Sequence, residues 1–519
     1  MIDLSAIPIL SLLTFLPLAG ALLLLCVPRQ REQLIRRFTL ALTIAVFLLS
    51  LPLFTQFDGT NPGFQFEELR TWIPSVGIGF HLGVDGISLL MVLLTTFLTP
   101  LVILGSWSAV TRRVKEYMMM FLALETAMLG VFLSLDMVLF YIFWEGMLIP
   151  MYFIIGVWGG ERRLYAAIKF FLFTMFGGVL MLVAILALYF MNGSQSGVYT
   201  FDYLALSRML IAGKQQVWPF FAFSLAFAIK VPMFPFHTWL PDAHVEAPTG
   251  GSVILAGILL KMGTYGFLRF CIPFFPNVAA TYGVWIMALA VIGIIYGALV
   301  SWVQPDLKKL VAFSSVSHLG FVMLGIFALT LQSVQGSLIQ MVNHGLSTGA
   351  LFLLVGMIYE RRHTRLIADF GGLARQMPVF TTFFLIITLS SIGLPGLNGF
   401  VGEFLVLLGT FQTHRLLAIL AATGVILSAV YMLTMVQRVH FGKLDKPENR
   451  SLTDLNRREI ATLVPIILLC IWIGLFPATF LDKSQAAAQK LLSEYQAKQG
   501  RVARIDEIPT ARSSVINPN

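Results

Sequence analysis

Apolar residues along this chain gather in long runs that are separated by short polar loops, and about 14 such runs can be marked out. A helix needs about 20 apolar residues to cross a hydrocarbon core of about 30 Å. The pattern therefore predicts an all-α polytopic membrane protein with about 14 transmembrane helices. We place the spans at about residues 7–27, 35–55, 83–107, 115–133, 136–157, 165–191, 217–236, 250–272, 278–298, 307–329, 333–359, 380–412, 416–440 and 460–480.

Composition agrees with this pattern and narrows the possible chemistry. Of the 519 residues, 57% are hydrophobic and 12% are charged, and the mean hydropathy is +0.84, which leaves little chain for a soluble catalytic domain. Cys26, Cys271 and Cys470 lie far apart, with neither a CxxC motif nor a Cys/His ligand spacing. We therefore expect no iron–sulfur, haem or zinc site and no redox cofactor in this chain.

The net charge of +9 is distributed unevenly between the two sides of the predicted membrane. If the loops alternate sides, 22 of the 35 Lys and Arg fall in one set of loops and five in the opposite set. This positive-inside signal places both termini on the side opposite the cytoplasm, which is the periplasmic side in a bacterial inner membrane. The excess of basic residues thus reflects topology, and we expect no nucleic-acid partner. The polar segment from about residue 482 to 519 is expected to form a surface helix around Lys490 and then a disordered end.

Several ionisable residues fall where charge is costly. A charged side chain at the bilayer centre costs about 2.5–3.5 kcal/mol or more, so such residues are rare and usually functional. At 1.5 Å per residue, groups about 10 residues from a span end lie near the midplane. Seven residues on seven spans meet this description: Glu125, Glu145, Lys230, Lys261, His318, His344 and Glu403.

Two of these spans also carry helix breakers. Pro232 follows Lys230 closely, and the stretch Gly393-Leu-Pro-Gly-Leu-Asn-Gly-Phe-Val-Gly precedes Glu403. Proline leaves carbonyls unpaired, which membrane interiors tolerate only beside hydrated cavities or inside protein. Each break falls in the fourth of five consecutive spans, so spans 4–8 and 9–13 are expected to form two inverted repeats.

We accordingly divide the chain into four parts. They are a three-helix N-terminal segment (1–107), a first repeat with Glu145, Lys230 and Lys261 (108–272), a second repeat with His318, His344 and Glu403 (273–440), and a last helix with a polar tail (441–519).

The residue types suit proton conduction. Bringing a carboxylate such as Glu145 toward or away from a buried Lys230 changes the affinity of that lysine for a proton. His318 and His344 can relay protons through either ring nitrogen, and Glu403 offers a carboxylate in the second repeat. Simpler roles stay open: Glu145 and Lys230 as a static ion pair, Lys261 and the histidines as packing residues, and Glu125 as a partner for another chain.

Three stretches resemble a known family. These are Phe140-Tyr-Ile-Phe-Trp-Glu-Gly-Met-Leu-Ile-Pro-Met-Tyr152, Ala228 to Pro248, and Gly393 to Glu403. They are similar to the antiporter-like proton-translocating subunits of respiratory complex I, and the resemblance runs from about the third span to the fourteenth. Sister subunits and related sodium/proton antiporters tend to carry lysine where this chain has Glu403.

The resemblance implies a proton-pumping, non-redox membrane subunit of NADH-quinone oxidoreductase with two half-channels. Glu145 and Lys230 would be the glutamate–lysine pair of the fifth and seventh helices. Lys261 would be the central lysine, His318 and His344 the linking residues, and Glu403 the terminal carboxylate. Flavin, iron–sulfur clusters and quinone would belong to partner subunits, and neighbouring antiporter-like subunits would adjoin the chain. Alternatives are a multisubunit cation/proton antiporter, the membrane arm of a hydrogenase or ferredoxin-dependent complex, and an inert scaffold.

Overall fold

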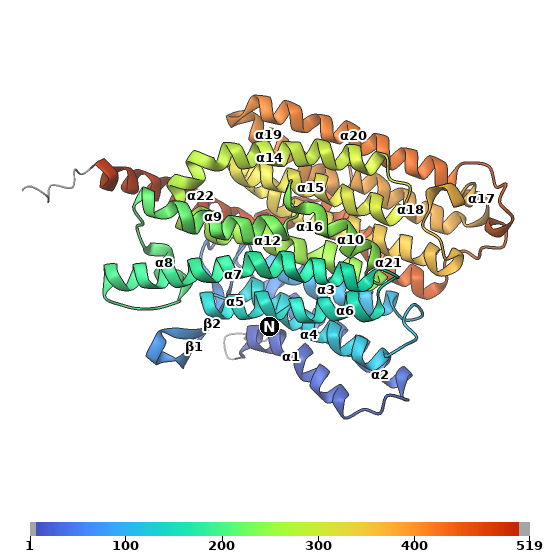
Figure 1. Cartoon of the computed structure of the whole chain (residues 1–519), viewed down its shortest axis with the longest axis horizontal. Coiled ribbons are helices and arrows are strands. Elements are labelled where there is room, and N and C mark those ends of the chain that lie inside the picture. Colours follow the sequence, from blue (N-terminus) through green and yellow to red (C-terminus); the bar gives the residue numbers. More distant parts are fainter. Residues whose placement is uncertain (1–6, 508–519) are drawn as a thin grey trace, which may run out of the picture.

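The computed structural model describes residues 7–507, which form one bundle of helices lying side by side (Figure 1). The first part of the chain contains α1 (Ile9–Leu25), α2 (Glu32–Gln56), β1 (Gln65–Ile73), β2 (Ile78–Val84), α3 (Leu89–Gly105), α4 (Val114–Leu133), α5 (Met137–Gly146), α6 (Leu148–Trp158), α7 (Arg163–Ser196), α8 (Tyr203–Arg208), α9 (Gly213–Lys230), η3 (Phe236–Thr238) and α10 (Trp239–Glu246). A continuous helical rod follows, made of α11 (Thr249–Ile254), η4 (Leu255–Leu259), α12 (Leu260–Gly266), η5 (Phe267–Cys271) and α13 (Ile272–Phe274). The remainder contains α14 (Pro276–Trp302), α15 (Leu307–Ala328), α16 (Leu331–Arg362), α17 (Leu373–Gln376), α18 (Pro378–Ser391), α19 (Asn398–Thr413), α20 (Arg415–His440), α21 (Arg457–Leu475) and α22 (Ala478–Glu507).

Ten helical segments in the described part of the chain are long and apolar enough to cross a membrane. Three shorter apolar helices, α1, α3 and α18, accompany them. The chain is therefore an integral membrane protein. The predicted surface helix around Lys490 lies within α22, whereas residues 508–519 fall outside the described part.

The exclusively α-helical expectation is wrong between α2 and α3. There, β1 and β2 pair antiparallel as a hairpin, and Gly77 turns the chain with a φ of +70°. The predicted third span, at 83–107, consequently begins later, with α3 at Leu89. The hairpin was missed because its apolar residues adjoin the next apolar run, which hides their strand alternation.

Helices are interrupted where the sequence places its breakers. Helix α9 ends at Lys230, and the chain continues through η3 into α10. Between α18 and α19, residues Ile392–Leu397 are not helical, and Gly393 and Gly396 adopt φ values of +78° and +92°. Glycine adopts these angles without the steric penalty that a Cβ atom brings. The break between α18 and α19 therefore depends on its glycines as well as on Pro395.

Burial separates an inner layer of helices from an outer one. The apolar stretch of α16 and the rod of residues 249–274 are buried within the bundle, whereas α2 and α20 expose most of their surface. The inner helices carry Lys261 and His344, and the outer helices carry none of the seven midplane residues. Six of the seven midplane residues are buried and Glu145 is partly exposed, so most of the costly charges lie inside protein.

The hairpin is joined to the bundle by a buried histidine. His81 on β2 has Nδ1 2.6 Å from Asp202 Oδ2 and Nε2 3.2 Å from Glu67 Oε2. Burial alone lowers the pKa of His81, but the carboxylates of Asp202 and Glu67 outweigh burial and raise this pKa above its ordinary value of 6.5. These ion pairs stabilise the hairpin fully below that ordinary value, and the stabilisation is lost as pH rises through the raised pKa.

We expect His81→Asn to loosen the hairpin more at pH 6 than at pH 9. Hydrogen bonds to charged groups contribute about 1.5–3 kcal/mol, so protection of the hairpin amides at pH 6 should fall by roughly tenfold or more. Hydrogen exchange of residues 65–84 in the purified protein, followed by mass spectrometry, measures this. An equal loss of protection at both pH values would show that His81 acts by packing alone.

Candidate functional site: a buried line of ionisable groups

Four of the midplane residues form one line through the centre of the bundle. Lys261 Nζ on α12 lies 2.6 Å from His344 Nδ1 on α16. The rings of His344 and His318 are 6.0 Å apart between centroids, and His318 Nδ1 on α15 lies 2.8 Å from Glu403 Oε1 on α19. All four side chains are at most 3% exposed. The line joins residues from the two predicted repeats.

The helix that carries Lys261 departs from α-helical geometry on both sides of this lysine. Segments η4 and η5, on either side of α12, are π-helical, a geometry often found at functional sites. Lys261 Nζ donates to the carbonyl of Ala256 within η4. A buried ammonium group thus has both a backbone and an imidazole acceptor. Nothing in the sequence signalled the π-helical turns, because they contain no proline.

Glu403 is surrounded by uncharged polar groups that sequence reasoning missed. Gln340 Nε2 donates to Glu403 Oε1 over 3.1 Å. Asn343 Nδ2 donates to the carbonyl of Asn398 over 2.7 Å, and Ser390 Oγ donates to Asn398 Oδ1 over 2.5 Å. These contacts tie α16 to α19 and, through Asn398, tie α19 to α18 across the break. Gln340 and Asn343 were not predicted because an amide within an apolar helix is less unusual than a charge. The position of Gln340, one helical turn before His344, is the one sequence feature that could have indicated it.

Glu145 and Lys230 are neighbours in the first predicted repeat, but no ion pair joins them among the described residues. The Lys230 ammonium instead lies 5.1 Å from the Trp144 ring centroid and 5.7 Å from that of Phe170. Its Nζ is 3.6 Å from Met147 Sδ. Glu145 lies against α7 at Gly178, where a Cβ atom would be only 1.8 Å from Glu145 Oε1. The structure thus holds the pair in an open arrangement, with the ammonium over aromatic faces.

Glu125 on α4 is wholly buried and separate from the line. Neither of its carboxylate oxygens has a hydrogen-bond partner among the described residues. Its neighbour Thr126 accepts a hydrogen bond from the backbone of Leu18 on α1 over 3.0 Å. Because the carboxyl group lies inside the bundle, it offers no surface for pairing with another chain.

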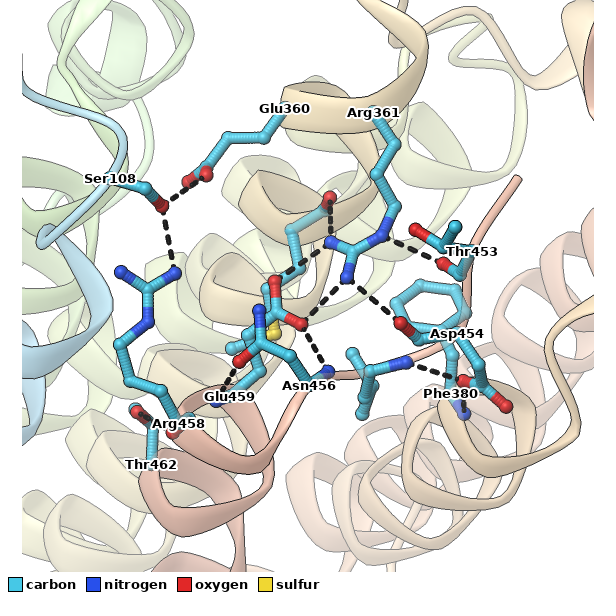
Figure 2. A network of polar contacts seen from close by, with 12 residues as sticks. Ser108, Glu360, Arg361, Phe380, Thr453, Asp454, Asn456, Arg458, Glu459 and Thr462 are labelled. Carbon is cyan, nitrogen blue, oxygen red and sulfur yellow. Dashed lines mark hydrogen bonds and ion pairs between the residues drawn. The ribbon is translucent and has the colours of Figure 1, made fainter. Parts of the chain in front are cut away.

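A network of polar contacts holds one end of α16 (Figure 2). Arg361 makes two hydrogen bonds to the Glu459 carboxylate, of 2.8 and 2.6 Å, and donates to the carbonyls of Thr453 and Asp454. Ser108 bridges Glu360 on α16 and Arg458 on α21. Bidentate arginine–carboxylate pairs fix geometry as well as charge. The network therefore sets the position of the helix that carries Gln340 and His344.

Beside this network lies a polar cavity of about 460 Å³. Its lining includes Ser108, Glu360, Glu246, Lys308 and Arg365, so charged groups of both signs face it. His244, two residues before Glu246 in the stretch from Ala228 to Pro248, is fully buried with its ring stacked 4.5 Å from the ring of Phe352. The cavity is large enough for several water molecules. Its lining reaches α11 and α16, two of the inner helices.

Within the described residues, no group of three or more His, Cys, Asp or Glu side chains is arranged to hold a metal ion. The ionisable groups along the line are instead paired with one another or with amides. Lysine, imidazole and carboxylate in contact form a chain of proton donors and acceptors. The arrangement is suited to moving protons within the membrane.

Two family models match this chain. Residues 134–429 match the model described as NADH:quinone oxidoreductase/Mrp antiporter, TM, and residues 12–135 match NADH-ubiquinone oxidoreductase chain 4, amino terminus. A Rhodobacter capsulatus protein named NADH-quinone oxidoreductase subunit M is 48% identical over 96% of this chain and 98% of its own length. An Arabidopsis thaliana protein named NADH-ubiquinone oxidoreductase chain 4 is 46% identical over 93% of this chain and 97% of its own.

Solved structures agree with these sequence relatives. A chain of respiratory complex I from Thermus thermophilus with bound NADH is 35% identical, with a TM-score of 0.84, covering 93% of this chain and 99% of that one. A chain of the Mrp complex from Dietzia sp. shares the fold, with a TM-score of 0.82 at 20% identity over 96% of this chain and 100% of that one.

Proposed function

Because this chain belongs to the family of NADH-quinone oxidoreductase subunit M and chain 4 proteins, we propose that it is a proton-pumping subunit of the membrane arm of that enzyme. It couples NADH oxidation and quinone reduction, carried out by partner subunits, to proton translocation across the membrane. Glu403, where sister subunits and related antiporters tend to carry lysine, favoured this branch of the superfamily, and the names of the relatives confirm the branch.

The observation that supports this function best is the line Lys261, His344, His318 and Glu403. Neighbouring members are close enough for a proton to pass directly or through one water molecule. Each member can exist with or without its proton, and the charge of one changes the proton affinity of the next. A proton that enters at one end therefore favours release at the other.

Glu145 and Lys230 act as the switch that drives the line. In the open arrangement, Lys230 faces Trp144 and Phe170 and lacks a carboxylate partner. Closing the pair would favour the protonated amine, and opening it would favour proton release toward Lys261. Movements transmitted from partner subunits need only change this separation by a few ångströms to change the direction of proton transfer.

The finer topology belongs to the same proposal. We assign about 14 spans with two inverted five-helix repeats, spans 4–8 and 9–13, on the basis of the paired helix breaks after Lys230 and before Glu403. The basic loops lie in the cytoplasm of a bacterial cell, and both termini lie on the periplasmic side of its inner membrane. The polar cavity at Glu360 and Lys308 then faces the cytoplasm and supplies protons.

This chain contributes no redox cofactor in our proposal. Flavin, iron–sulfur clusters and quinone sites belong to partner subunits, and neighbouring antiporter-like subunits adjoin the chain in the membrane arm. The part that this chain plays in the enzyme is proton translocation alone. Its own residues hold and pass protons, and they exclude bulk water from the line by burial.

Two alternatives are less well supported. A cation/proton antiporter shares the fold, as the Mrp complex shows, but that likeness is at 20% identity, whereas subunit M relatives reach 48%. The membrane-bound sulfane sulfur reductase, an archaeal respiratory membrane complex, resembles the chain at 24% identity with a TM-score of 0.80, which again concerns the fold.

Purification with partners tests the proposal directly. A C-terminal tag, mild detergent and mass spectrometry should recover flavin and iron–sulfur subunits, and the same fraction should reduce quinone with NADH. Reconstituted into vesicles, the fraction should acidify the lumen when NADH is added outside. Recovery with antiporter-type membrane subunits alone, without NADH oxidation, would overturn the assignment to NADH-quinone oxidoreductase.

We predict that Glu125 lies outside the proton pathway formed by the line. Because its carboxyl group contacts no member of the line, Glu125→Gln should retain more than roughly half of the pumping rate, since the amide preserves shape and polarity. Vesicle acidification per NADH oxidised measures this, with the level of assembled enzyme as the control. A loss as large as that of Glu403→Gln would place Glu125 on the pathway.

A further inference from the structure

Glu403 presents its two carboxylate oxygens to different surroundings. Oε1 receives both available donors, His318 Nδ1 at 2.8 Å and Gln340 Nε2 at 3.1 Å. Oε2 is buried and has no hydrogen-bond partner among the described residues. An ionised carboxylate only accepts hydrogen bonds, so two donors on Oε1 hold its orientation. The two oxygens are therefore unequal in function.

The free oxygen faces the broken helix. A Cβ atom built on Gly393 would lie 3.4 Å from Glu403 Oε2, whereas a Cβ atom on Gly396 would meet nothing within 4 Å. Both glycines lie in the non-helical stretch between α18 and α19. Non-helical backbone at this depth is tolerated where it is buried in protein or lines a water-filled cavity. The break thus lies directly beside the one oxygen that is open to accept a proton.

We infer that Gln340 is a positioning residue for proton transfer: with His318 it anchors Oε1 of Glu403, so that the proton binds to Oε2 and exchanges with water at the Gly393 break. In the release step, the Oε2–H bond breaks with its electron pair left on the carboxylate, and the proton passes to a water molecule. This inference rests on the proposed function and specifies where the line ends.

Gln340 is well placed for this role because it is itself fixed. Asn343 Nδ2 lies 3.4 Å from Gln340 Oε1, and a Cβ atom on Gly402 would lie 2.2 Å from that same oxygen. The glycine on α19 therefore leaves room for the amide beside Glu403. The other titratable groups near Glu403 are His318 on α15, His344 on α16 and Tyr431 on α20. Gln340, unlike these groups, donates a hydrogen bond to Glu403 without being able to gain or lose a proton.

Gln340→Met in the intact enzyme tests the inference, because it keeps side-chain length and removes the donor. Without that donor the protonated carboxyl group is favoured, so the pH of half-maximal pumping should move by about one unit to the alkaline side. NADH oxidation by a soluble electron acceptor should be unchanged. Gln335→Met on the same helix is the matched control, since the Gln335 amide contacts the carbonyl of Leu481 instead.

A glycine pair supplies a second measurement that does not depend on Gln340. Gly393→Ala and Gly396→Ala both place a side chain on a backbone with positive φ, so they share this strain. Only Gly393→Ala adds a methyl group against Oε2. We expect pumping per assembled enzyme to fall at least threefold further in Gly393→Ala than in Gly396→Ala.

The outcomes separate this inference from the proposed function. If Glu403→Gln leaves pumping intact, the proposed role of the line fails. If Glu403→Gln abolishes pumping while Gln340→Met keeps the wild-type pH profile, or the two alanine variants pump equally, the inference about Oε2 is overturned and the proposed function stands.

Discussion

Proton pumping is expected to fall at least about tenfold when Lys230 is replaced by methionine, while the enzyme still assembles. Methionine fills the space between Trp144, Phe170 and Met147 but carries no proton, so the switch that we propose between Lys230 and Glu145 is lost. Because methionine removes a buried charge that has no paired carboxylate in this structure, folding should not be harmed. Vesicle acidification, divided by NADH-driven quinone reduction in the same sample, measures the effect.

Lys169→Met is the appropriate control for this prediction. Lys169 lies on α7, in the helix that also contributes Phe170, but its ammonium pairs with Asp242 over 2.7 Å at a partly exposed position. Losing such a pair costs about 0–1 kcal/mol. Equal pumping in the wild type and the Lys230→Met variant would favour the scaffold reading, in which the chain only fills the membrane arm.

The second large effect concerns assembly. Asp85, which precedes α3, makes two hydrogen bonds with Arg269, of 2.8 and 2.6 Å, and both side chains are nearly fully buried. Asp85→Ala leaves a buried guanidinium without its counter-charge, which typically costs about 3–5 kcal/mol. We expect the steady-state amount of assembled enzyme to fall several-fold, as measured on native gels with antibody against a partner subunit.

Removing both charges tests the cause of that loss. In Asp85→Ala combined with Arg269→Met, no isolated charge is buried, so assembly should recover at least half of what the single substitution removed. No recovery in the double variant would show that the ion pair contributes specific geometry at the α3 boundary. In either case, pumping per assembled enzyme should be close to normal, because the pair lies outside the line.

The members of the line could be predicted from the sequence because each is an ionisable residue within an apolar run. The distance of Lys261, His318, His344 and Glu403 from their span ends placed them at one depth, where the structure brings them together. Which residues touch depends on the packing of α12, α15, α16 and α19, of which only α15 and α16 are consecutive in the chain. No single apolar pattern encodes that arrangement, so contact between the two histidines had no sequence signal.

Features without charge or helix breakers were not predicted. Gln340 and Asn343 are ordinary residues for a buried polar helix face, and their role depends on the position of Glu403 across the interface between α16 and α19. The separation of Glu145 from Lys230 depends on side-chain rotamers, which periodicity does not report. The hairpin was missed because the apolar residues of β2 adjoin the apolar run of α3, which hides their strand alternation.

The complete burial of the Lys261 rod and of α16 has a consequence for biogenesis. A helix with a midplane lysine is unstable against lipid, and the acceptor that Lys261 finds on His344 is synthesised later, in α16. When residues 249–274 leave the ribosome, Lys261 therefore still lacks its His344 acceptor, and this helical segment is less stable in the membrane than in the finished protein. Its integration is completed only once α16 has followed, so premature termination between the two helices leaves a fragment that membrane quality-control proteases should recognise.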